Sequence, residues 1–260
     1  MILFNDIPLS SNDFSEDIFK NGLNIYEVIR ILNGEAIFLK DNLNRLDNSL
    51  KGSNIEIDVQ SLNIPDKLNR FIHLQSIHEG NVKYVLHFEA NSMDEYLFQI
   101  PHNYPTAQNY QEGINTITYE SIRENPGVKY VNDTLRTLTN QLIQKHHVYE
   151  VLLVDHEGYI TEGSRSNVFF IKDNTLYTSP IEYVLPGTSR KRVFDICREY
   201  QLPIVEQRIA KNSLHEFDVA FLTGTSPLIL PINQIDTIHY DVNLPFLRQL
   251  MDHYFALLKK

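Results

Sequence analysis

Residues 162–190 read EGSRSNVFFIKDNTLYTSPIEYVLPGTSR, and this segment constrains the fold more than any other part of the chain. It joins Glu162 to a turn of small residues, then to two short β-rich runs, and finally to a Pro-Gly-Thr-Ser loop that opens a helix. A helix start offers backbone N–H groups to an anion, and a carboxylate in a poorly hydrated site needs a partner. The segment therefore predicts a binding site for a phosphorylated, basic heterocycle beside a sheet.

The composition points to a globular enzyme and away from a nucleic-acid or membrane partner. Of the 260 residues, 42% are hydrophobic and 22% are charged, and the formal net charge is -10. No basic stripe is present to attract nucleic acid or an anionic membrane. No stretch approaches the roughly 18 apolar residues of a membrane span, and the segment MILFNDIPLSS lacks the features of a signal peptide. We therefore expect a cytoplasmic protein.

The single cysteine, Cys197, excludes a disulfide framework and argues against a cysteine-based metal site. It lies in a helical pattern with Val193, Ile196 and Tyr200, which predicts a buried structural thiol. The ten histidines show no spacing typical of metal ligands. We therefore expect no metal site.

Short strands and helices alternate along the chain, which predicts an α+β (mixed α/β) fold in two lobes. Residues 25–32 form a strand candidate, and residues 82–88 alternate in a period of two that predicts a half-buried strand. Asp41 is a candidate N-cap for the first helix, and Asn132 or Asp133 for a later one. We expect a small N-terminal α/β domain at residues 1–110 and a larger C-terminal domain at residues 111–260.

Lys129 follows a loop and comes just before this later helix. A lysine becomes a Schiff-base nucleophile when desolvation or a nearby cation lowers its pKa. A loop-to-helix junction that faces a cleft can supply such a setting. Taken alone, however, a lysine is far more often a solvated surface group.

Two further groups are candidates for binding the heterocycle. Glu162 could pair with a protonated pyridine nitrogen and so keep the ring an electron sink, although it could also be an ordinary turn carboxylate. Two Gly-Thr-Ser loops, at Gly187 and at Gly224, offer N–H groups and hydroxyls to an anion. Arg45 could complete a phosphate site, although a solvated helix arginine is the simpler interpretation.

The order of these motifs resembles the class-IV aminotransferases, the fold-type IV family of pyridoxal phosphate enzymes. This family includes branched-chain aminotransferases, D-amino acid aminotransferases and 4-amino-4-deoxychorismate lyases. The family signature begins with a Glu, followed by a small residue two positions after it and an Asn five positions after it. An aliphatic and an aromatic residue come directly after the Asn. An aliphatic-x-Thr motif follows, and an aliphatic-x-Gly motif with a later Arg ends the signature. The chain matches at Glu162, Ser164, Asn167, Val168, Phe169, Leu176, Thr178, Leu185, Gly187 and Arg190.

The resemblance implies a two-lobed enzyme that binds pyridoxal 5′-phosphate (PLP) between the lobes. Lys129 would carry the cofactor and move the proton, Glu162 would pair with the pyridine nitrogen, and Tyr26 would line the substrate pocket. The family also implies a homodimer that acts on small amino acids and oxo acids. The phosphate contacts would come from Arg45, Thr188, Ser189, Gly224 and Thr225.

The chain departs from the family where the substrate carboxylate binds. Branched-chain enzymes carry a Tyr-x-Arg in the strand where this chain has Asn81-Val82-Lys83, and the Arg-x-His of D-amino acid enzymes has no counterpart. Lys83 and His87 are the candidate substrate residues, but four strand residues separate them by roughly 13 Å, too far for both to bind one carboxylate. Thr188 replaces the usual aliphatic residue of the phosphate loop, a change that leaves the backbone donors intact.

Three functions remain open from the sequence. The first is transamination from a branched-chain or similar hydrophobic amino acid to a 2-oxo acid. The second is 4-amino-4-deoxychorismate lyase activity, which the run Arg123-Glu124-Asn125-Pro126 before the lysine favours. The third is a scaffold without turnover, which is disfavoured because the lysine, the glutamate, the arginine and both loops all match.

Overall fold

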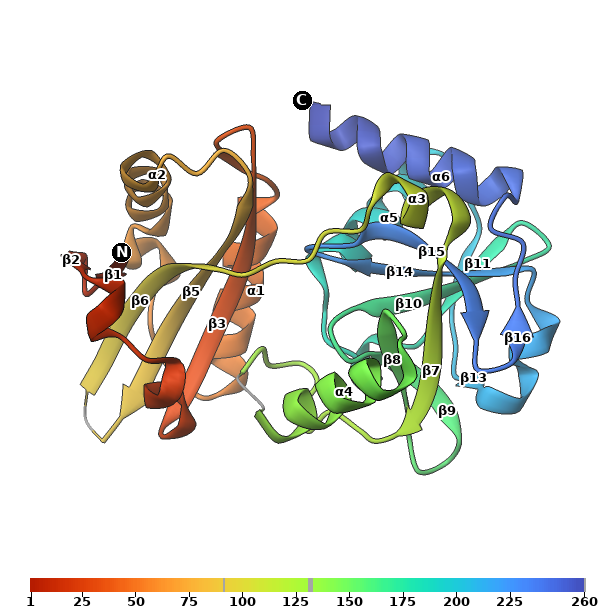
Figure 1. Ribbon diagram of the computed structural model, residues 1–260, viewed down its shortest axis with the longest axis horizontal. Coiled ribbons are helices and arrows are strands. Elements are labelled where there is room, and N and C mark those ends of the chain that lie inside the picture. The colour runs from red at the N-terminus through yellow and green to blue at the C-terminus, as the bar shows by residue number, and fades with distance from the viewer. Residues whose placement is uncertain (91, 131–132, 260) are drawn as a thin grey trace. The chain divides into compact units, whose positions relative to one another are not determined.

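The computed structural model describes residues 1–90, 92–130 and 133–259, so the candidate cap Asn132 lies outside the described residues. The chain divides into two compact units (Figure 1). Unit 1 consists of Met1–Asn103 and Gly127–Asp133, and unit 2 of Tyr104–Pro126 and Thr134–Lys260. Each unit combines helices with its own sheet, which confirms the predicted α+β class.

The sheet of unit 1 has six strands in the order β2-β1-β6-β5-β3-β4, and every neighbouring pair is antiparallel. Two α-helices and three short 3-10 helices complete the unit. The strands are β1 Ile2–Phe4, β2 Ile7–Leu9, β3 Leu23–Leu32, β4 Glu35–Ala36, β5 Gly80–Glu89 and β6 Ser92–Ile100, and the helices are η1 Ser11–Asp13, η2 Glu16–Lys20, α1 Leu39–Gly52, η3 Val59–Leu62 and α2 Ile64–Gln75.

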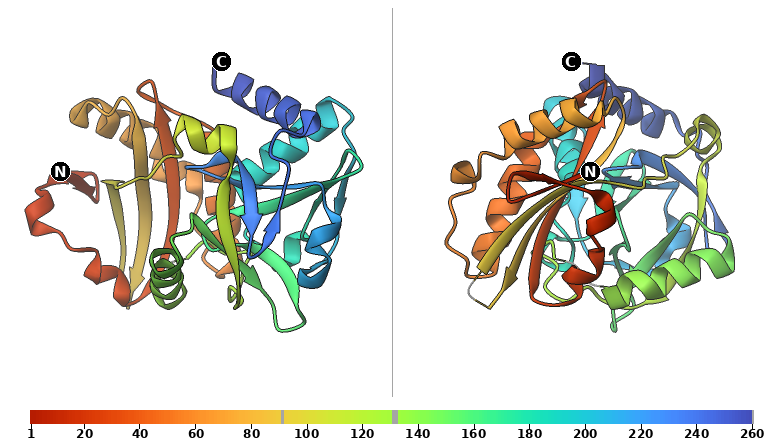
Figure 2. Two further views of the ribbon diagram at one scale, coloured as in Figure 1. Left: turned by 45° about the vertical axis from the view of Figure 1, so that its right-hand side comes forward. Right: turned by 60° about the vertical axis from the view of Figure 1, so that its left-hand side comes forward.

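The two faces of this sheet are covered by different parts of the chain. Helices α1 and α2 pack on one face (Figure 2), against Ile25 and Ile29 of β3 and their neighbours on β5. On the other face Phe14 and Phe19, in the segment of η1 and η2, pack against aromatic residues of β6. Because both faces are covered, β5 is buried on both sides, and the expectation of a half-buried strand was wrong.

The start of α1 also differs from the prediction. The helix begins at Leu39, after Phe38 in a left-handed conformation with φ of 55°, and it has no side-chain cap. Asp41 therefore does not cap the helix, because it lies within the first turn, where it is 5% exposed. A carboxylate in the first turn still interacts favourably with the helix dipole.

Unit 2 contains a ten-stranded sheet in the order β12-β11-β10-β14-β15-β7-β8-β9-β13, with β16 paired to β15. Its strands are β7 Ile114–Glu120, β8 Glu150–Val154, β9 Tyr159–Gly163, β10 Asn167–Lys172, β11 Thr175–Thr178, β12 Ile204–Glu206, β13 Ile209–Ala210, β14 Val219–Gly224, β15 Leu228–Ile235 and β16 Ile238–His239. Its helices are α3 Ala107–Glu112, α4 Asp133–His146, η4 Ile181–Tyr183, α5 Thr188–Glu199, η5 Lys211–Glu216, α6 Pro245–Ala256 and η6 Leu257–Lys259.

The central strands of unit 2 are mostly apolar and are buried along nearly their whole length, because both of their faces are covered. All five residues of β8 are buried, as are five of the six in β10 and in β14. Such continuous runs are typical of strands inside a sheet that is covered on both sides. Phe169 of β10 and Phe221 of β14 lie opposite each other with parallel rings whose centroids are 5.2 Å apart.

In the described part of the chain, every helix is too short or too polar to span a lipid bilayer.

Cys197 lies on the buried side of α5 and is 2% exposed, which confirms the prediction of a buried thiol. Burial raises the pKa of this thiol from 9.0 to about 12. Because the folded-state pKa is the higher one, the stability linked to the protonated thiol is complete below about pH 9 and is lost as the pH rises towards about 12.

We therefore expect a disulfide reagent such as DTNB at pH 8 to leave the native protein unlabelled and to modify one thiol per chain in denaturant. The measurement is the absorbance of the released thiolate, with glutathione as the reactive control. Stoichiometric labelling of the native protein within minutes would contradict the buried environment.

Candidate active site

The residues predicted to form the site divide between the two units. Unit 1 contributes Tyr26, Arg45, Lys83, His87 and Lys129, and unit 2 contributes Glu162, Thr188, Ser189, Gly224 and Thr225.

Lys129 is attached to β3 through its backbone. Its carbonyl accepts a hydrogen bond of 3.1 Å from the N–H of Tyr26, and the next residue, Tyr130, forms a β-bridge with Ile25. The N–H of Lys129 donates to Ser49 Oγ on α1 at 3.2 Å. The Nζ of Lys129 lies 5.1 Å from the centre of the Tyr26 ring, a distance typical of a cation–π contact. The structure therefore brings Lys129 and Tyr26 together.

Arg45 forms a buried ion pair with Glu27, a residue that the sequence analysis did not single out. Nε and Nη2 of Arg45 donate to the two oxygens of Glu27 at 2.8 and 2.6 Å, and Asn42 Nδ2 donates to the same carboxylate at 2.8 Å. Glu27 is 1% exposed and Arg45 is 5% exposed. The alternation of β3 gives the reason, because the residue after Tyr26 must face α1.

The guanidinium of Arg45 stays positively charged beside Glu27. Burial alone lowers the pKa of the guanidinium, but the adjacent Glu27 carboxylate more than offsets this effect, so the pKa is raised above its ordinary value. The paired edge of the guanidinium uses Nε and one Nη2 hydrogen. The fixed fork of an arginine directs the remaining N–H donors away from that edge, so the same side chain can also bind an anion.

Lys83 lies on the other face of the sheet, among aromatic rings. Its Nζ is 5.3 Å from the ring centres of Phe19 and Tyr26 and 5.5 Å from that of Phe98. The ammonium pairs with Glu16 Oε2 at 2.8 Å, and Glu16 is 54% exposed. The Tyr26 ring thus contacts the amino groups of both Lys83 and Lys129.

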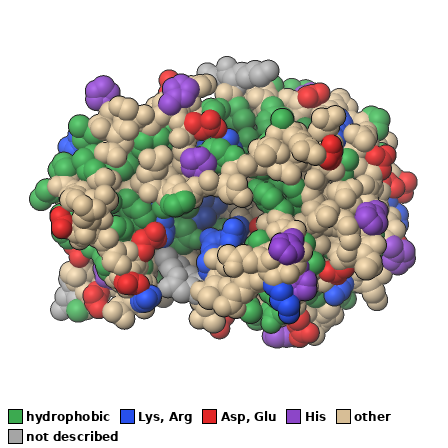
Figure 3. All heavy atoms as spheres, viewed as in Figure 1, with side chains coloured by type: hydrophobic (Ala, Val, Ile, Leu, Met, Phe, Trp, Pro, Cys, Tyr) green, Lys and Arg blue, Asp and Glu red, His purple; other side chains and the backbone are tan. Residues whose placement is uncertain are grey.

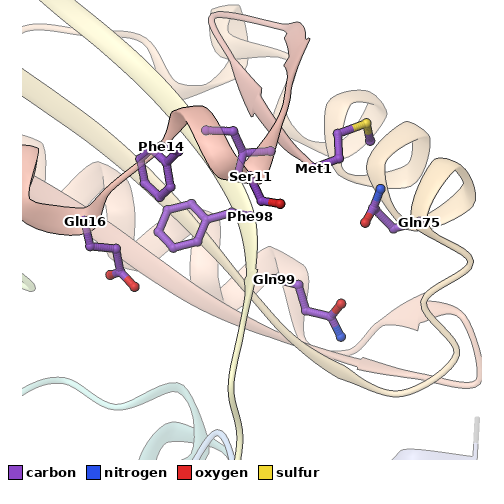
Figure 4. A pocket seen from close by; sticks show the side chains of 8 residues that line it. Met1, Ser11, Phe14, Glu16, Gln75, Phe98 and Gln99 are labelled. Atoms are coloured by element: carbon purple, nitrogen blue, oxygen red, sulfur yellow. The ribbon is translucent and has the colours of Figure 1, made fainter.

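An open hollow of about 490 Å³ lies beside this aromatic group (Figure 4). The rings of Phe14 and Phe98 are neighbours at its edge, with centroids 5.1 Å apart, and Glu16 also lines it. None of the predicted cofactor residues lines this hollow, whose remaining wall is formed by Met1, Ile2, Ser11, Gln75 and Gln99.

His87 is 4% exposed and is bonded to the adjacent strand. Its Nδ1 lies 2.6 Å from Asn24 Oδ1, and its ring packs against Phe19 with centroids 6.1 Å apart. These contacts connect β5 to β3 behind the aromatic group. The structure therefore brings Tyr26, Lys83 and Lys129 together and gives His87 a position four residues further along β5.

In unit 2, Glu162 lies near the end of β9 and is 2% exposed. Its Oε1 accepts a hydrogen bond of 2.6 Å from Nε of Arg123, and its Oε2 accepts one of 3.1 Å from the N–H of Leu185. Arg123 was noted in the sequence only as part of an Arg-x-Asn-Pro run. The acidic signature residue itself signals such a partner, since a buried carboxylate requires compensation.

The signature residue Asn167 connects this carboxylate to the start of α5. Its Nδ2 donates to the carbonyl of Leu185 at 2.9 Å, and the N–H of Gly187 donates to the same carbonyl at 2.7 Å. A Cβ on Gly187 would lie 2.1 Å from Asn167 Oδ1, so any other residue here would force the Asn167 side chain to move. Leu185 therefore contacts Glu162 through its N–H and the α5 loop through its carbonyl.

The start of α5 has the properties of an anion site. Gly187 is the N-cap and has no side-chain cap hydrogen bond, and the first turn contains no acidic residue. The first N–H groups of a helix have no partner within it and carry the positive end of the helix dipole. Thr188 and Ser189 occupy this turn and are 7% and 3% exposed.

The second predicted loop, at Gly224, Thr225 and Ser226, connects β14 to β15 in a tight antiparallel hairpin. Its position after an apolar strand agrees with the sequence-based expectation. In the described residues, His, Cys, Asp and Glu side chains form no group of three or more that could hold a metal ion.

On the face drawn in Figure 3, basic and acidic side chains of the described residues are interspersed among apolar ones. Such a mixed surface gives little long-range attraction for a polyanion. Several charged side chains of the described residues are instead buried, among them those of Glu27, Arg45 and Glu162.

Comparison with known proteins agrees with these features. D-alanine aminotransferase of Bacillus licheniformis is 26% identical over 251 residues, which cover 90% of this chain and 88% of that protein. The crystal structure of Escherichia coli branched-chain amino acid aminotransferase has a TM-score of 0.86 at 21% identity and covers 98% of this chain and 93% of its own. That of 4-amino-4-deoxychorismate lyase from Pseudomonas aeruginosa has a TM-score of 0.84 at 18% identity and covers 98% of both chains.

The two structural likenesses show a shared fold, the fold-type IV architecture that the sequence predicted. The family described as amino-transferase class IV matches residues 24–235, which include the β3 segment, Lys129, Glu162 and both Gly-Thr loops. The chain therefore belongs to the class IV aminotransferase family, whose members are pyridoxal phosphate-dependent enzymes.

Proposed function

We propose that this enzyme is an amino acid aminotransferase that carries PLP on Lys129 and transfers the amino group of a hydrophobic amino acid to a 2-oxo acid, with 2-oxoglutarate as the leading acceptor. The observation that carries the proposal is the linked pair of groups in unit 2, where a buried carboxylate and an uncapped helix start share Leu185 as a neighbour.

These groups fit the two ends of PLP. Glu162 suits a protonated pyridine nitrogen, and the first turn of α5 suits a phosphate. Only Pro186 and Gly187 separate Leu185, which is bonded to Glu162, from Thr188 at the start of α5, and three residue steps reach at most about 10 Å. The two groups therefore lie close enough together to suit one small heterocycle with a phosphate arm.

The residues of unit 1 suit the aldehyde and the phosphate charge. Lys129 is positioned by backbone hydrogen bonds on both sides of its Cα, to Tyr26 and to Ser49, so its side chain leaves from a fixed point. Arg45 retains donors beyond its pair with Glu27 and keeps its positive charge. We propose that Arg45 binds the phosphate, with Thr188, Ser189, Gly224 and Thr225 as further donors.

In the proposed reaction, different residues of the chain have different roles. Bound PLP supplies an electron sink for a carbanion at the substrate Cα. In the proposed mechanism the Nζ of Lys129 would take the proton from the substrate Cα and would return it to C4′ of the cofactor. Glu162 keeps the ring nitrogen protonated, and Arg123 fixes the orientation of Glu162 through its bond to Oε1. Tyr26 packs against the Lys129 side chain and limits where the amino group can move.

Lys83 is the proposed partner of a substrate carboxylate. Its ammonium contacts the same Tyr26 ring as Lys129, and its pairing partner Glu16 is largely exposed. Because Glu16 is 54% exposed, water screens its attraction to Lys83 and solvates Glu16 when it leaves, so an incoming carboxylate can replace it. The rings of Phe19, Tyr26 and Phe98 around Lys83 suit the hydrophobic side chain of an amino donor. His87 would support this face through Asn24.

The second candidate is 4-amino-4-deoxychorismate lyase activity on the same cofactor. Arg123, in the run that motivated this alternative, is the residue bonded to Glu162, so the run is part of the proposed cofactor site. The fold likeness to the Pseudomonas aeruginosa lyase is compatible with either reaction. The homodimer expected from the resemblance and the cytoplasmic location expected from the sequence stay part of this proposal.

The first prediction concerns Lys129. After incubation with PLP and borohydride reduction, we expect peptide mass spectrometry to find the cofactor on residue 129. Lys129→Ala is expected to abolish this label and to lower turnover by about 10³-fold, because it removes both the attachment point and the proton carrier. Lys51→Ala, an exposed lysine of α1, is the matched control and should retain both properties. Wild-type protein that is labelled only elsewhere would rule out the assigned role of Lys129.

The second prediction separates the two reactions. Branched-chain amino acids, tested beside D-alanine with 2-oxoglutarate present, are expected to give glutamate. By contrast, 4-amino-4-deoxychorismate alone is expected to give no pyruvate. Coupled assays for glutamate and for pyruvate measure both products. Pyruvate and 4-aminobenzoate formed without any oxo acid would instead identify the lyase.

The third prediction tests Lys83 with two variants of opposite effect. Lys83→Met is expected to raise KM for 2-oxoglutarate about 10- to 100-fold, the value of one lost hydrogen bond to a charged group. Glu16→Gln removes the competing carboxylate and is expected to lower that KM about twofold to fivefold. Lys67→Met, which breaks the ion pair of Lys67 with Glu95 in the same unit, is the control and should leave KM unchanged. Equal KM values for all three variants would exclude Lys83 from substrate binding.

A further inference from the structure

Glu150, the first residue of β8, is a further buried carboxylate among the described residues and is 3% exposed. It accepts four hydrogen bonds. Its Oε1 accepts hydrogen bonds from Ser164 Oγ at 2.6 Å and from the N–H of Val151 at 2.9 Å. Its Oε2 accepts hydrogen bonds from Ser166 Oγ at 3.1 Å and from the N–H of Arg165 at 3.2 Å. Three of the four donors belong to residues 164–166.

These donors lie in the turn that follows Glu162. Within it, the N–H of Gly163 donates to the carbonyl of Ser166 at 2.7 Å. A Cβ on Gly163 would lie 2.1 Å from Ser166 Oγ and 3.2 Å from Cγ of Glu150, so the side chain of Glu150 packs directly over this glycine. The turn is therefore closed around the carboxylate of Glu150.

The turn connects Glu150 to both parts of the proposed cofactor site. The hydroxyl of Ser164 donates to Glu150, and the carbonyl of Ser164 accepts a hydrogen bond of 3.2 Å from Nη2 of Arg123. The Nε of the same Arg123 donates to Glu162. On the other side, Ser166 precedes Asn167, whose amide fixes the loop that begins α5. A displaced turn would thus move Arg123, Glu162 and the helix start together.

We propose that Glu150 is a positioning residue for the cofactor site: its carboxylate fixes the 163–166 turn and thereby the orientation of Glu162 and the loop before α5. The proposal rests on the proposed function, and it assigns Glu150 no contact with the cofactor or the substrate.

The pattern of donors requires a carboxylate and excludes an amide. Each oxygen of Glu150 receives one backbone N–H, from Val151 on one side and from Arg165 on the other, and a backbone N–H cannot accept a hydrogen bond. A glutamine has one acceptor oxygen, so in either orientation its NH₂ group faces one of these N–H groups. The hydroxyls of Ser164 and Ser166 can turn to accept instead. Glu150→Gln is therefore nearly isosteric, yet it cannot satisfy the turn.

The test compares full-length wild-type protein with Glu150→Gln, both stripped of cofactor. Titration with PLP, followed by its visible absorbance, is expected to give a Kd about 10- to 100-fold higher for the variant, as found when a residue that orients a ligand-binding group is changed. Reloaded with PLP, the variant is expected to lose kcat about 10-fold with KM for the amino donor changed less than about twofold, since Glu150 lies in unit 2 and the proposed substrate residues in unit 1.

A second readout does not involve the cofactor. In the apoprotein, amide hydrogen exchange at Gly163 and Arg165 is expected to be about 10-fold faster in Glu150→Gln, because the turn opens more readily. Glu95→Gln is the matched control: Glu95 is a partly buried carboxylate of unit 1 that binds Lys67 and Tyr84, so it should leave Kd and exchange in the turn unchanged. If Glu150→Gln does not fold, Ser166→Ala, which removes one donor to Oε2, is expected to raise Kd about threefold to 10-fold.

The outcomes are distinct. A folded Glu150→Gln with wild-type Kd, kcat and exchange overturns the positioning role and leaves the proposed function standing. If Glu150→Gln is unfolded, a wild-type Kd for PLP in Ser166→Ala overturns the positioning role of Glu150. A wild-type protein that binds no PLP contradicts the proposed function instead, and the exchange rates of the apoprotein then decide whether Glu150 fixes the turn. Faster exchange confined to 163–166, with a raised Kd, supports the proposal.

Discussion

Burial of negative charge is the constraint on which the rest of this structure depends. Glu27, Glu150 and Glu162 are 1–3% exposed, and each would be strongly disfavoured without compensation. The compensation differs in each case. The donors to Glu27 include a bidentate arginine, those to Glu162 include one arginine N–H and one backbone N–H, and those to Glu150 include two hydroxyls and two backbone N–H groups.

The ion pair of Arg45 and Glu27 belongs to the permanent structure, whereas Glu162 is proposed to bind the cofactor. The bidentate pair of Arg45 and Glu27 anchors α1 to β3, and breaking one partner would leave an uncompensated charge in the interior. Glu162 accepts hydrogen bonds from Nε of Arg123 and from the N–H of Leu185. Its position suits a group that must respond to a bound ring nitrogen. Family membership and geometry thus agree on a PLP enzyme, with the substrate selected by residues outside this network.

Much of the fold and the main motifs could be read from the sequence because they depend on local chemistry. The signature from Glu162 to Arg190, the loop at Lys129 and the α5 start are each defined by adjacent residues, and the structure forms them where they were expected. The burial of β5 on both faces depended on a long-range contact, because Phe14 and Phe19 cover it from more than 60 residues away. The roles of Arg123, Glu27 and Glu150 were missed for the same reason, since each acts on a partner distant in sequence. The cap predicted at Asp41 failed because Phe38 starts the helix with a left-handed residue.

The close packing at Gly163 and Gly187 has a consequence for altering this enzyme by directed evolution. At each of these positions even a methyl group would collide with a neighbouring polar atom. Libraries that cover the 162–190 segment should therefore keep these two glycines fixed. The aromatic rings around Lys83 belong to a different sheet and offer side chains of many sizes, so diversity concentrated there can retune substrate preference while the cofactor machinery remains intact.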